Sequence, residues 1–171
     1  MPLLDLTERE DQGPVPAGKY HAKVEDAEER KTGDKGKLPE GTPMIWMRFS
    51  IIEPIGFEPT EVGEDGIEKP VNTEGRGVFH QIVIPPQEIN GQPYKNYKMM
   101  NGILFRSLLA LGYTRDELES GDFDLDYNDL KGRESVLTVG RREYNDPDTD
   151  EVIYSNTVKG MKAATQTTGV L

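Results

Sequence analysis

The stretch of residues 43–53 constrains the fold most, because its side chains change character at every second position. The set at odd positions is uniformly apolar and consists of Ile45, Met47, Phe49 and Ile51. The set at even positions consists of Met44, Trp46, Arg48, Ser50 and Ile52. A period of two places successive side chains on opposite faces of a β-strand. We therefore expect a strand whose odd positions are core and whose outer face carries Trp46 beside Arg48.

Four further segments have the pattern of strands. Residues 19–24 alternate, with Tyr20, Ala22 and Val24 on one side and Lys19, His21 and Lys23 on the other. Residues 78–84 form a strand that Pro85-Pro86 stops, because proline cannot donate to a sheet ladder. Residues 135–144 and 151–162 form a terminal hairpin around a turn at 145–150. The Asn90-Gly91 pair signals another turn.

One segment, residues 95–111, has the period of an amphipathic helix. Its apolar stripe contains Met100, Leu104, Leu108 and Leu111, widened by Ile103, Phe105 and Leu109. Gly112 provides a C-terminal stop. Thr114 and Glu117 have the spacing of a capping box and predict a short second helix.

The order of these elements is three strands, a helix and a hairpin, which predicts a mainly β fold. We expect a five-stranded OB-type Greek-key barrel with the amphipathic helix between strands three and four. A hydrophobic content of 35%, with 18 glycines and 12 prolines, favours a small β-rich core with many turns. The predicted organisation is a flexible acidic arm (1–16), one domain (17–164) with an acidic loop (54–76), and a polar tail (165–171).

Several chemistries find no support in the sequence. The chain has no cysteine, so disulfides and thiolate metal sites are excluded. Two Asp-x-Asp-x-Asp runs, at 122–126 and 146–150, lack the glycine and glutamate of a calcium loop, and we interpret them as connection and turn. No nucleotide-binding or nucleophile motif is present. We expect no cofactor, no metal and no enzymatic activity. With no apolar membrane span and no signal peptide, we expect a cytoplasmic location.

The chain has a net charge of −11, and its whole acidic excess lies in three segments that together carry −14. Residues 1–16 carry −3, residues 57–75 carry −5 and residues 114–130 carry −6. The remaining, strand-bearing segments together carry +3. The charge therefore does not exclude a face that binds nucleic acid, although such binding depends on Lys and Arg.

Short motifs along residues 16–162 resemble a family of bacteriophage replication-module proteins. They are Pro-Ala-Gly-Lys-Tyr-His-Ala-Lys-Val-Glu-Asp-Ala-Glu (16–28), Gly-Thr-Pro-Met-Ile-Trp-Met-Arg-Phe-Ser-Ile (41–51), Gly-Arg-Gly-Val-Phe (75–79), Leu-Leu-Ala-Leu-Gly (108–112), Asp-Leu-Lys-Gly-Arg-Glu-Ser-Val-Leu-Thr-Val (129–139) and Asn-Thr-Val-Lys-Gly-Met (156–161). The resemblance implies an OB-fold protein that binds single-stranded DNA during phage DNA replication and recombination, in the host cytoplasm. Replication or recombination proteins are then further partners, and self-association remains open.

Sequence-tolerant binding of a single strand requires aromatic faces for the bases and cations along the backbone path. The candidates lie on the expected strands two to five and on the loop after strand one. They are Trp46, Arg48, Lys31, Lys35, Lys37, Phe79, Arg141, Arg142, Tyr144, Tyr154 and Lys159. Phe79 belongs to this set only if His80, Ile82 and Ile84 form the core side of their strand.

Each candidate also has a structural interpretation. Trp46 can pack under a loop instead of stacking on bases. Tyr144 and Tyr154 can form a cross-strand pair that stabilises the hairpin. The three lysines can form a solubilising turn. Arg141 and Arg142 must point to opposite faces, so at most one contacts a bound strand. An acidic structural or protein-interaction barrel, as a virion or recruitment component, is the alternative function.

Overall fold

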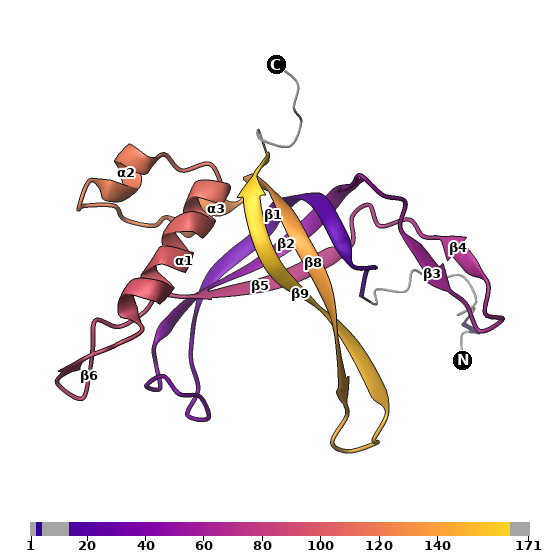
Figure 1. Ribbon diagram of the computed structural model, residues 1–171, viewed down its shortest axis with the longest axis horizontal. Coiled ribbons are helices and arrows are strands. Elements are labelled where there is room, and N and C mark those ends of the chain that lie inside the picture. The colour runs from indigo at the N-terminus through magenta and orange to yellow at the C-terminus, as the bar shows by residue number, and fades with distance from the viewer. Residues whose placement is uncertain (1–2, 5–13, 165–171) are drawn as a thin grey trace.

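The computed structural model describes residues 3–4 and 14–164 of the chain (Figure 1). The strands of its main sheet are β1 (Gly18–Lys31), β2 (Pro43–Ile55), β5 (Gly77–Val83), β8 (Glu134–Asn145) and β9 (Val152–Ala163). Two small ribbons are β3 (Thr60–Val62) with β4 (Glu68–Pro70) and β6 (Glu88–Ile89) with β7 (Gln92–Pro93). The helices are α1 (Tyr97–Ala110), α2 (Arg115–Glu119) and α3 (Tyr127–Leu130).

The main sheet has five antiparallel strands in the order β5-β2-β1-β8-β9. In Figure 1, β8 and β9 run steeply across the direction of β1, β2 and β5, and the sheet folds over so that β9 comes close to β5. No hydrogen-bonded ladder joins β5 to β9 in the described part of the chain. The fold is therefore mainly β with a five-stranded antiparallel sheet, and the closed barrel is not found.

The core lies on the face of the sheet that the alternation predicts. Tyr20, Ala22 and Val24 of β1 are at most 1% exposed, and so are Ile45, Met47, Phe49 and Ile51 of β2. The helix α1 packs against β9 and β5 and adds Leu108 to the core, which Leu111 joins just past its end. Ile103, which the sequence placed on the edge of the apolar stripe, is 45% exposed instead. The capping box of Thr114 and Glu117 is confirmed at the start of α2.

Strand β1 is longer than predicted and contains two register shifts, one between His21 and Ala22 and one between Val24 and Asp26. A bulge inserts a residue and changes which residues face each side of the sheet. Beyond the second shift Ala27 is buried, and Glu28 pairs with Trp46. The strand therefore presents Glu28 and Arg30 on the same face as Trp46.

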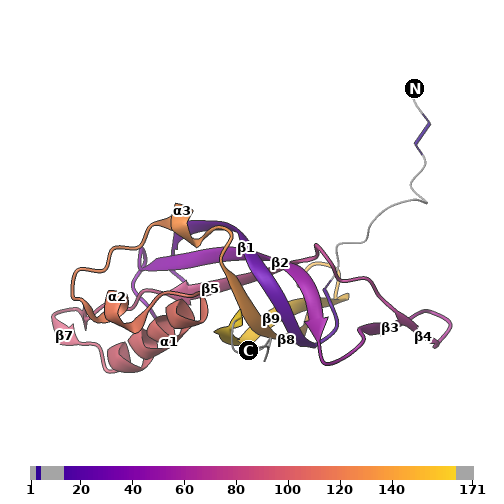
Figure 2. The same cartoon turned by 90° about the horizontal axis from the view of Figure 1, so that it is seen from above.

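The acidic segment 54–76 is not purely a loop, because it contains the β3–β4 hairpin. Asp65 and Gly66 make its turn: the Asp65 carboxylate accepts from the Ile67 N–H at 3.0 Å, and Gly66 has φ 75°. Figures 1 and 2 show this hairpin projecting away from the main sheet. Much of the acidic excess thus lies outside the core, as expected from the charge distribution.

Residues 14–16 are part of the folded body, although the sequence assigned them to the arm. Val15 is completely buried, and the Tyr20 hydroxyl donates to the Pro16 carbonyl oxygen at 2.6 Å. The rest of the predicted arm, apart from residues 3–4, and the predicted tail at 165–171 lie outside the described residues. No helix within residues 3–4 and 14–164 combines the length and apolarity that a membrane crossing needs.

The end of the β8–β9 hairpin extends beyond the rest of the sheet. Strand β1 pairs with β8 only from Glu134 to Val139, so residues 140–145 of β8 pair with β9 alone. The predicted turn at 145–150 is confirmed, with the Asp146 N–H donating to the Glu151 carbonyl oxygen at 2.8 Å. In Figure 1 this hairpin and the 32–42 loop protrude on the same side of the molecule.

Candidate nucleic-acid interface

The outer face of β2 and β5 carries a pair of stacked aromatic rings. The centroids of Trp46 and Phe79 lie 5.6 Å apart with an interplanar angle of 29°. Val78 and Ile82 of β5 are buried, so the condition set for Phe79 is met and its ring points outward. Phe79 is 55% exposed, whereas Trp46 is partly buried. Phe79 is therefore the more exposed ring of the pair, although the sequence analysis gave Trp46 the main role.

Arg30 covers the indole of Trp46 from the β1 side. Its guanidinium carbon lies 4.0 Å from the ring centroid, which is the geometry of a cation–π contact. The Arg30 Nε donates to a Glu28 carboxylate oxygen at 2.7 Å. Because β2 lies between β1 and β5, Trp46 has Arg30 on one side and Phe79 on the other. The sequence-based selection missed Arg30, since it ended the strand at Val24 and treated what followed as connection.

Arg48 lies on the same outer face, directly opposite Phe79 in the β2–β5 ladder. Its guanidinium carbon is 6.0 Å from the Phe79 ring centroid, and its Nη1 lies 3.6 Å from a Glu25 carboxylate oxygen. The side chain packs over Gly77, where a Cβ atom would come within 2.9 Å of the Arg48 Nε. That Nε is buried without a hydrogen-bond partner in the described part of the chain. The pairing of Arg48 with Trp46 on one face is thus confirmed.

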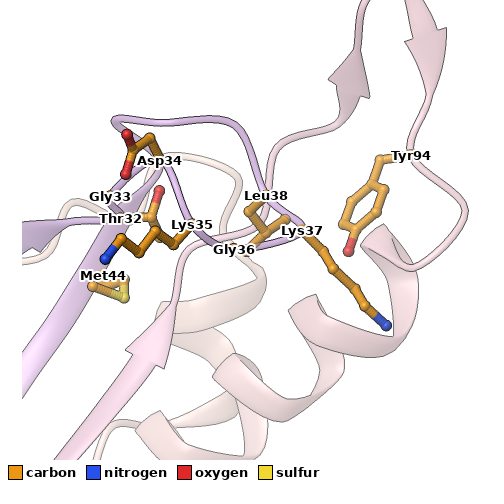
Figure 3. Close-up of a pocket in the computed structure, with 9 residues that line it drawn as sticks. All are labelled: Thr32, Gly33, Asp34, Lys35, Gly36, Lys37, Leu38, Met44 and Tyr94. Carbon is orange, nitrogen blue, oxygen red and sulfur yellow. The ribbon is translucent and has the colours of Figure 1, made fainter. Parts of the chain in front are cut away.

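The loop after β1 borders a hollow at the other end of this face. Lys35, Lys37, Met44 and Tyr94 are among the residues that line this hollow, whose volume is about 530 Å³ (Figure 3). Met44 is an even-numbered residue of β2, so the hollow continues the face that carries Trp46. Lys31 does not belong here: it pairs with Pro43 and therefore shares the side of Ile45. Tyr94 was not predicted, because it lies in the irregular segment before α1.

A second, smaller cleft of about 180 Å³ lies between the edges of β5 and β9. Phe79 and Tyr154 both line it, together with Pro14. Arg141 lies over the Tyr154 ring at 5.5 Å, and its Nη2 is 3.2 Å from a Glu61 carboxylate oxygen. Phe79 from the outer face of β5 and Tyr154 from the side of β9 that carries Val158 therefore border the same cleft.

The remaining candidates are not part of this arrangement. In the β8–β9 register Tyr144 pairs with Ile153 and Tyr154 pairs with Glu143, so the two tyrosines lie on opposite faces. The predicted cross-strand tyrosine pair is therefore wrong. Arg142 pairs with Ser155 on the Tyr144 side, away from the face of Tyr154. Lys159 lies at the register shift of β9, with its side chain across Gly140.

The electrostatics of the Trp46–Phe79 face are nearly balanced. Glu28 and Glu25 lie beside Arg30 and Arg48, so acidic partners offset the two arginines. His80 adds no charge behind Phe79, because burial lowers the pKa of its imidazole to about 4. Lys35 and Lys37 are exposed and have no ion pair among the described residues. The unpaired cations beside this face therefore lie at the 32–42 loop, which also carries Asp34 and Glu40 and is neutral as a whole.

This arrangement offers ring faces for stacking and guanidinium groups for anions on one surface. The same combination is what sequence-tolerant binding of single strands requires. Among residues 3–4 and 14–164, no three His, Asp or Glu side chains are grouped closely enough to hold a metal ion. No protein-family model matches the chain, and no curated protein matches it in sequence.

Proposed function

We propose that this protein binds single-stranded DNA without catalysing a reaction on it. The observation that carries the proposal is the Trp46–Phe79 stack, which lies between Arg30 and Arg48 on one outward face. Every base has a flat face that can stack on an aromatic ring, and neighbouring cations can bind the phosphates. The binding we propose is therefore tolerant of sequence and sensitive to salt.

The strand order supports an OB-type barrel as the scaffold. In this proposal strands one to five of that fold are β1, β2, β5, β8 and β9. The two edge strands of the sheet, β5 and β9, are then strands three and five, and they lie next to each other. OB barrels bind nucleic acid on strands two and three, between the loops one-two and four-five. Here these are β2 and β5, the 32–42 loop and the β8–β9 turn. Phage DNA replication or recombination in a host cytoplasm is the role that the sequence resemblance adds to this proposal.

The charge on the interface limits the affinity that we expect. Two arginines share the aromatic face with two glutamates, and exposed ion pairs of this kind contribute little. Lys35 and Lys37 add phosphate contacts at one end only. We therefore propose that stacking supplies most of the binding free energy at moderate salt, with about 1–3 kcal/mol per stacked base.

Trp46 fluorescence provides the decisive experiment, because Trp46 is the only tryptophan in the chain. Titration with oligo-dT at low salt should quench its emission, and the affinity should fall as salt is raised. A parallel titration with oligo-U tests the preference for DNA over RNA. If neither quenching nor a mobility shift occurs at low salt, the proposal is wrong.

A protein-interaction role is the second candidate, and the β3–β4 hairpin favours it. Val62 and Ile67 are 68% and 56% exposed on this projecting hairpin, among the acidic residues of segment 57–75. An exposed apolar pair within an acidic surface fits a partner with basic residues around an apolar patch. Glu58→Gln combined with Glu64→Gln separates the two roles. The double variant should lose such a partner but bind oligo-dT as well as or better than the parent.

A further inference from the structure

The indole of Trp46 is covered in the free protein. Arg30 lies 4.0 Å from the ring centroid on the β1 side, and Phe79 lies on the β5 side. Glu28 holds Arg30 in place through the 2.7 Å bond between its carboxylate and the Arg30 Nε. Phe79, in contrast, is 55% exposed and needs no rearrangement to receive a base. The two rings of the pair are therefore not equally accessible.

A base and a guanidinium group compete for the same space on an aromatic face. Both are planar, and both stack in close contact with the ring. With its guanidinium 4.0 Å from the centroid, Arg30 leaves no room for a base on that side of the indole. A strand can reach Trp46 on that side only after Arg30 has moved.

Resting on the function proposed above, we propose that Arg30 is a displaceable cap on Trp46. When a single strand binds, Arg30 leaves the indole face to a base and moves its guanidinium to a neighbouring phosphate. Glu28 opposes this movement, because its carboxylate holds Arg30 in the free protein and is close enough to repel the incoming phosphate. Glu28 is therefore the residue that limits affinity at this position.

The contacts that Arg30 must give up, with Glu28 and with the indole, are weaker than the base stacking that replaces them. The Arg30 and Glu28 side chains are 45% and 50% exposed. An ion pair and a cation–π contact at this exposure are each weak, whereas stacking of a base on tryptophan is stronger. The contact between Arg30 and a phosphate also replaces the charge interaction lost with Glu28. The exchange is thus favourable when a strand is present and reverses when it leaves.

The first test uses the free protein and does not depend on DNA. Acrylamide quenching of Trp46 measures how open its ring is. Arg30→Ala and Arg30→Lys should both raise the quenching constant, by about twofold, because neither side chain covers the indole with a planar group. Unchanged quenching in both variants would show that Arg30 is not a cap.

The second test measures oligo-dT binding as a function of salt. Glu28→Gln should tighten binding about three- to tenfold while leaving the slope of log K against log salt close to that of the parent, because Arg30 contacts the same phosphate in both proteins. Arg30→Lys should bind at least as tightly as the parent, whereas Arg30→Ala should lose about 0.7 of the slope. Glu119→Gln is the matched control. Glu119 pairs with Arg115 on α2, so this substitution also removes one negative charge from an ion pair, but at a site away from Trp46.

The outcomes separate the two proposals. If the parent protein binds no oligonucleotide, the proposed function fails, whatever the quenching shows. If the parent binds but Glu28→Gln behaves like Glu119→Gln, the cap is wrong and the function stands. Circular dichroism of each variant checks that the sheet has folded.

Discussion

The side-chain amide of Asn156 binds both backbone polar groups of Val15. Its nitrogen donates to the Val15 carbonyl oxygen at 2.9 Å, and its oxygen accepts from the Val15 N–H at 2.8 Å. The same nitrogen reaches the Gly140 carbonyl oxygen at 3.2 Å. One residue of β9 thus fixes the segment that leads into β1, with Val15 completely buried beneath it.

Replacing Asn156 should therefore destabilise the fold. Asn156→Ala removes both partners of the Val15 backbone and leaves buried polar groups unpaired, which should lower the free energy of unfolding by about 1–3 kcal/mol. Urea denaturation followed by circular dichroism measures the change. Asn101→Ala, at an exposed position of α1, is the control and should change stability by less than about 0.5 kcal/mol. Equal effects of the two substitutions would contradict the role of Asn156.

Gly18 should tolerate no side chain because the Phe57 ring lies against it. A Cβ atom at position 18 would come within 2.3 Å of the Phe57 ring, which packs edge-on against Tyr20. Gly18→Ala should therefore cost about 1–3 kcal/mol through overpacking, seen as a lower melting temperature. Gly36→Ala has open space around it and should leave the melting temperature nearly unchanged.

Phe79 should contribute more to binding than to stability. Phe79→Ala removes the open ring of the aromatic pair and should weaken oligo-dT binding by about 1–3 kcal/mol. The loss of its contact with Trp46 should cost about 1 kcal/mol of stability. Fluorescence anisotropy of a labelled oligomer measures the affinity. Tyr144→Ala removes a ring of similar exposure on the side of the β8–β9 hairpin away from the Phe79 cleft, and it should bind as the parent does.

His80 should make the protein less stable as the pH falls. Burial lowers the pKa of its imidazole from 6.5 to about 4 in the folded state. Between these two values the unfolded chain binds a proton that the folded chain does not, so the free energy of unfolding decreases from pH 6.5 down to pH 4. The complete loss is about 3 kcal/mol. The difference in stability between the parent and His80→Gln, measured at pH 7 and pH 4.5, isolates this contribution, and a difference that does not change with pH would refute it.

Much of the fold follows from alternation in the sequence. The apolar residues of β2 are core because a strand with one buried face permits only one register, and Ile45 and Phe49 mark that face unambiguously. The helix α1 and its glycine stop follow equally from the spacing of Leu104, Leu108 and Leu111. These signals are local, so a single sequence contains them.

The features that were missed depend on contacts between distant segments. The bulge near Asp26 has no signal of its own, yet it decides that Arg30 faces Trp46. The tyrosines of the last hairpin were paired wrongly because the turn length, and not the residue type, sets which positions are opposite. Val15, an isolated apolar residue between two prolines, joins the core, and its backbone is bound by Asn156, which lies far along the chain.

Beyond Asn156, the end of the β8–β9 hairpin pairs with no other strand, so it can open from its tip without disturbing the core. Amide hydrogens of residues 142–145 and 152–155 should therefore exchange with deuterium sooner than those of β1 and β2. Tyr154 lies on this end of the hairpin, whereas Trp46 and Phe79 lie on β2 and β5. A ligand that contacts both Phe79 and Tyr154 would lie between a rigid surface and a flexible one. The same fold could then bind ligands of different thickness.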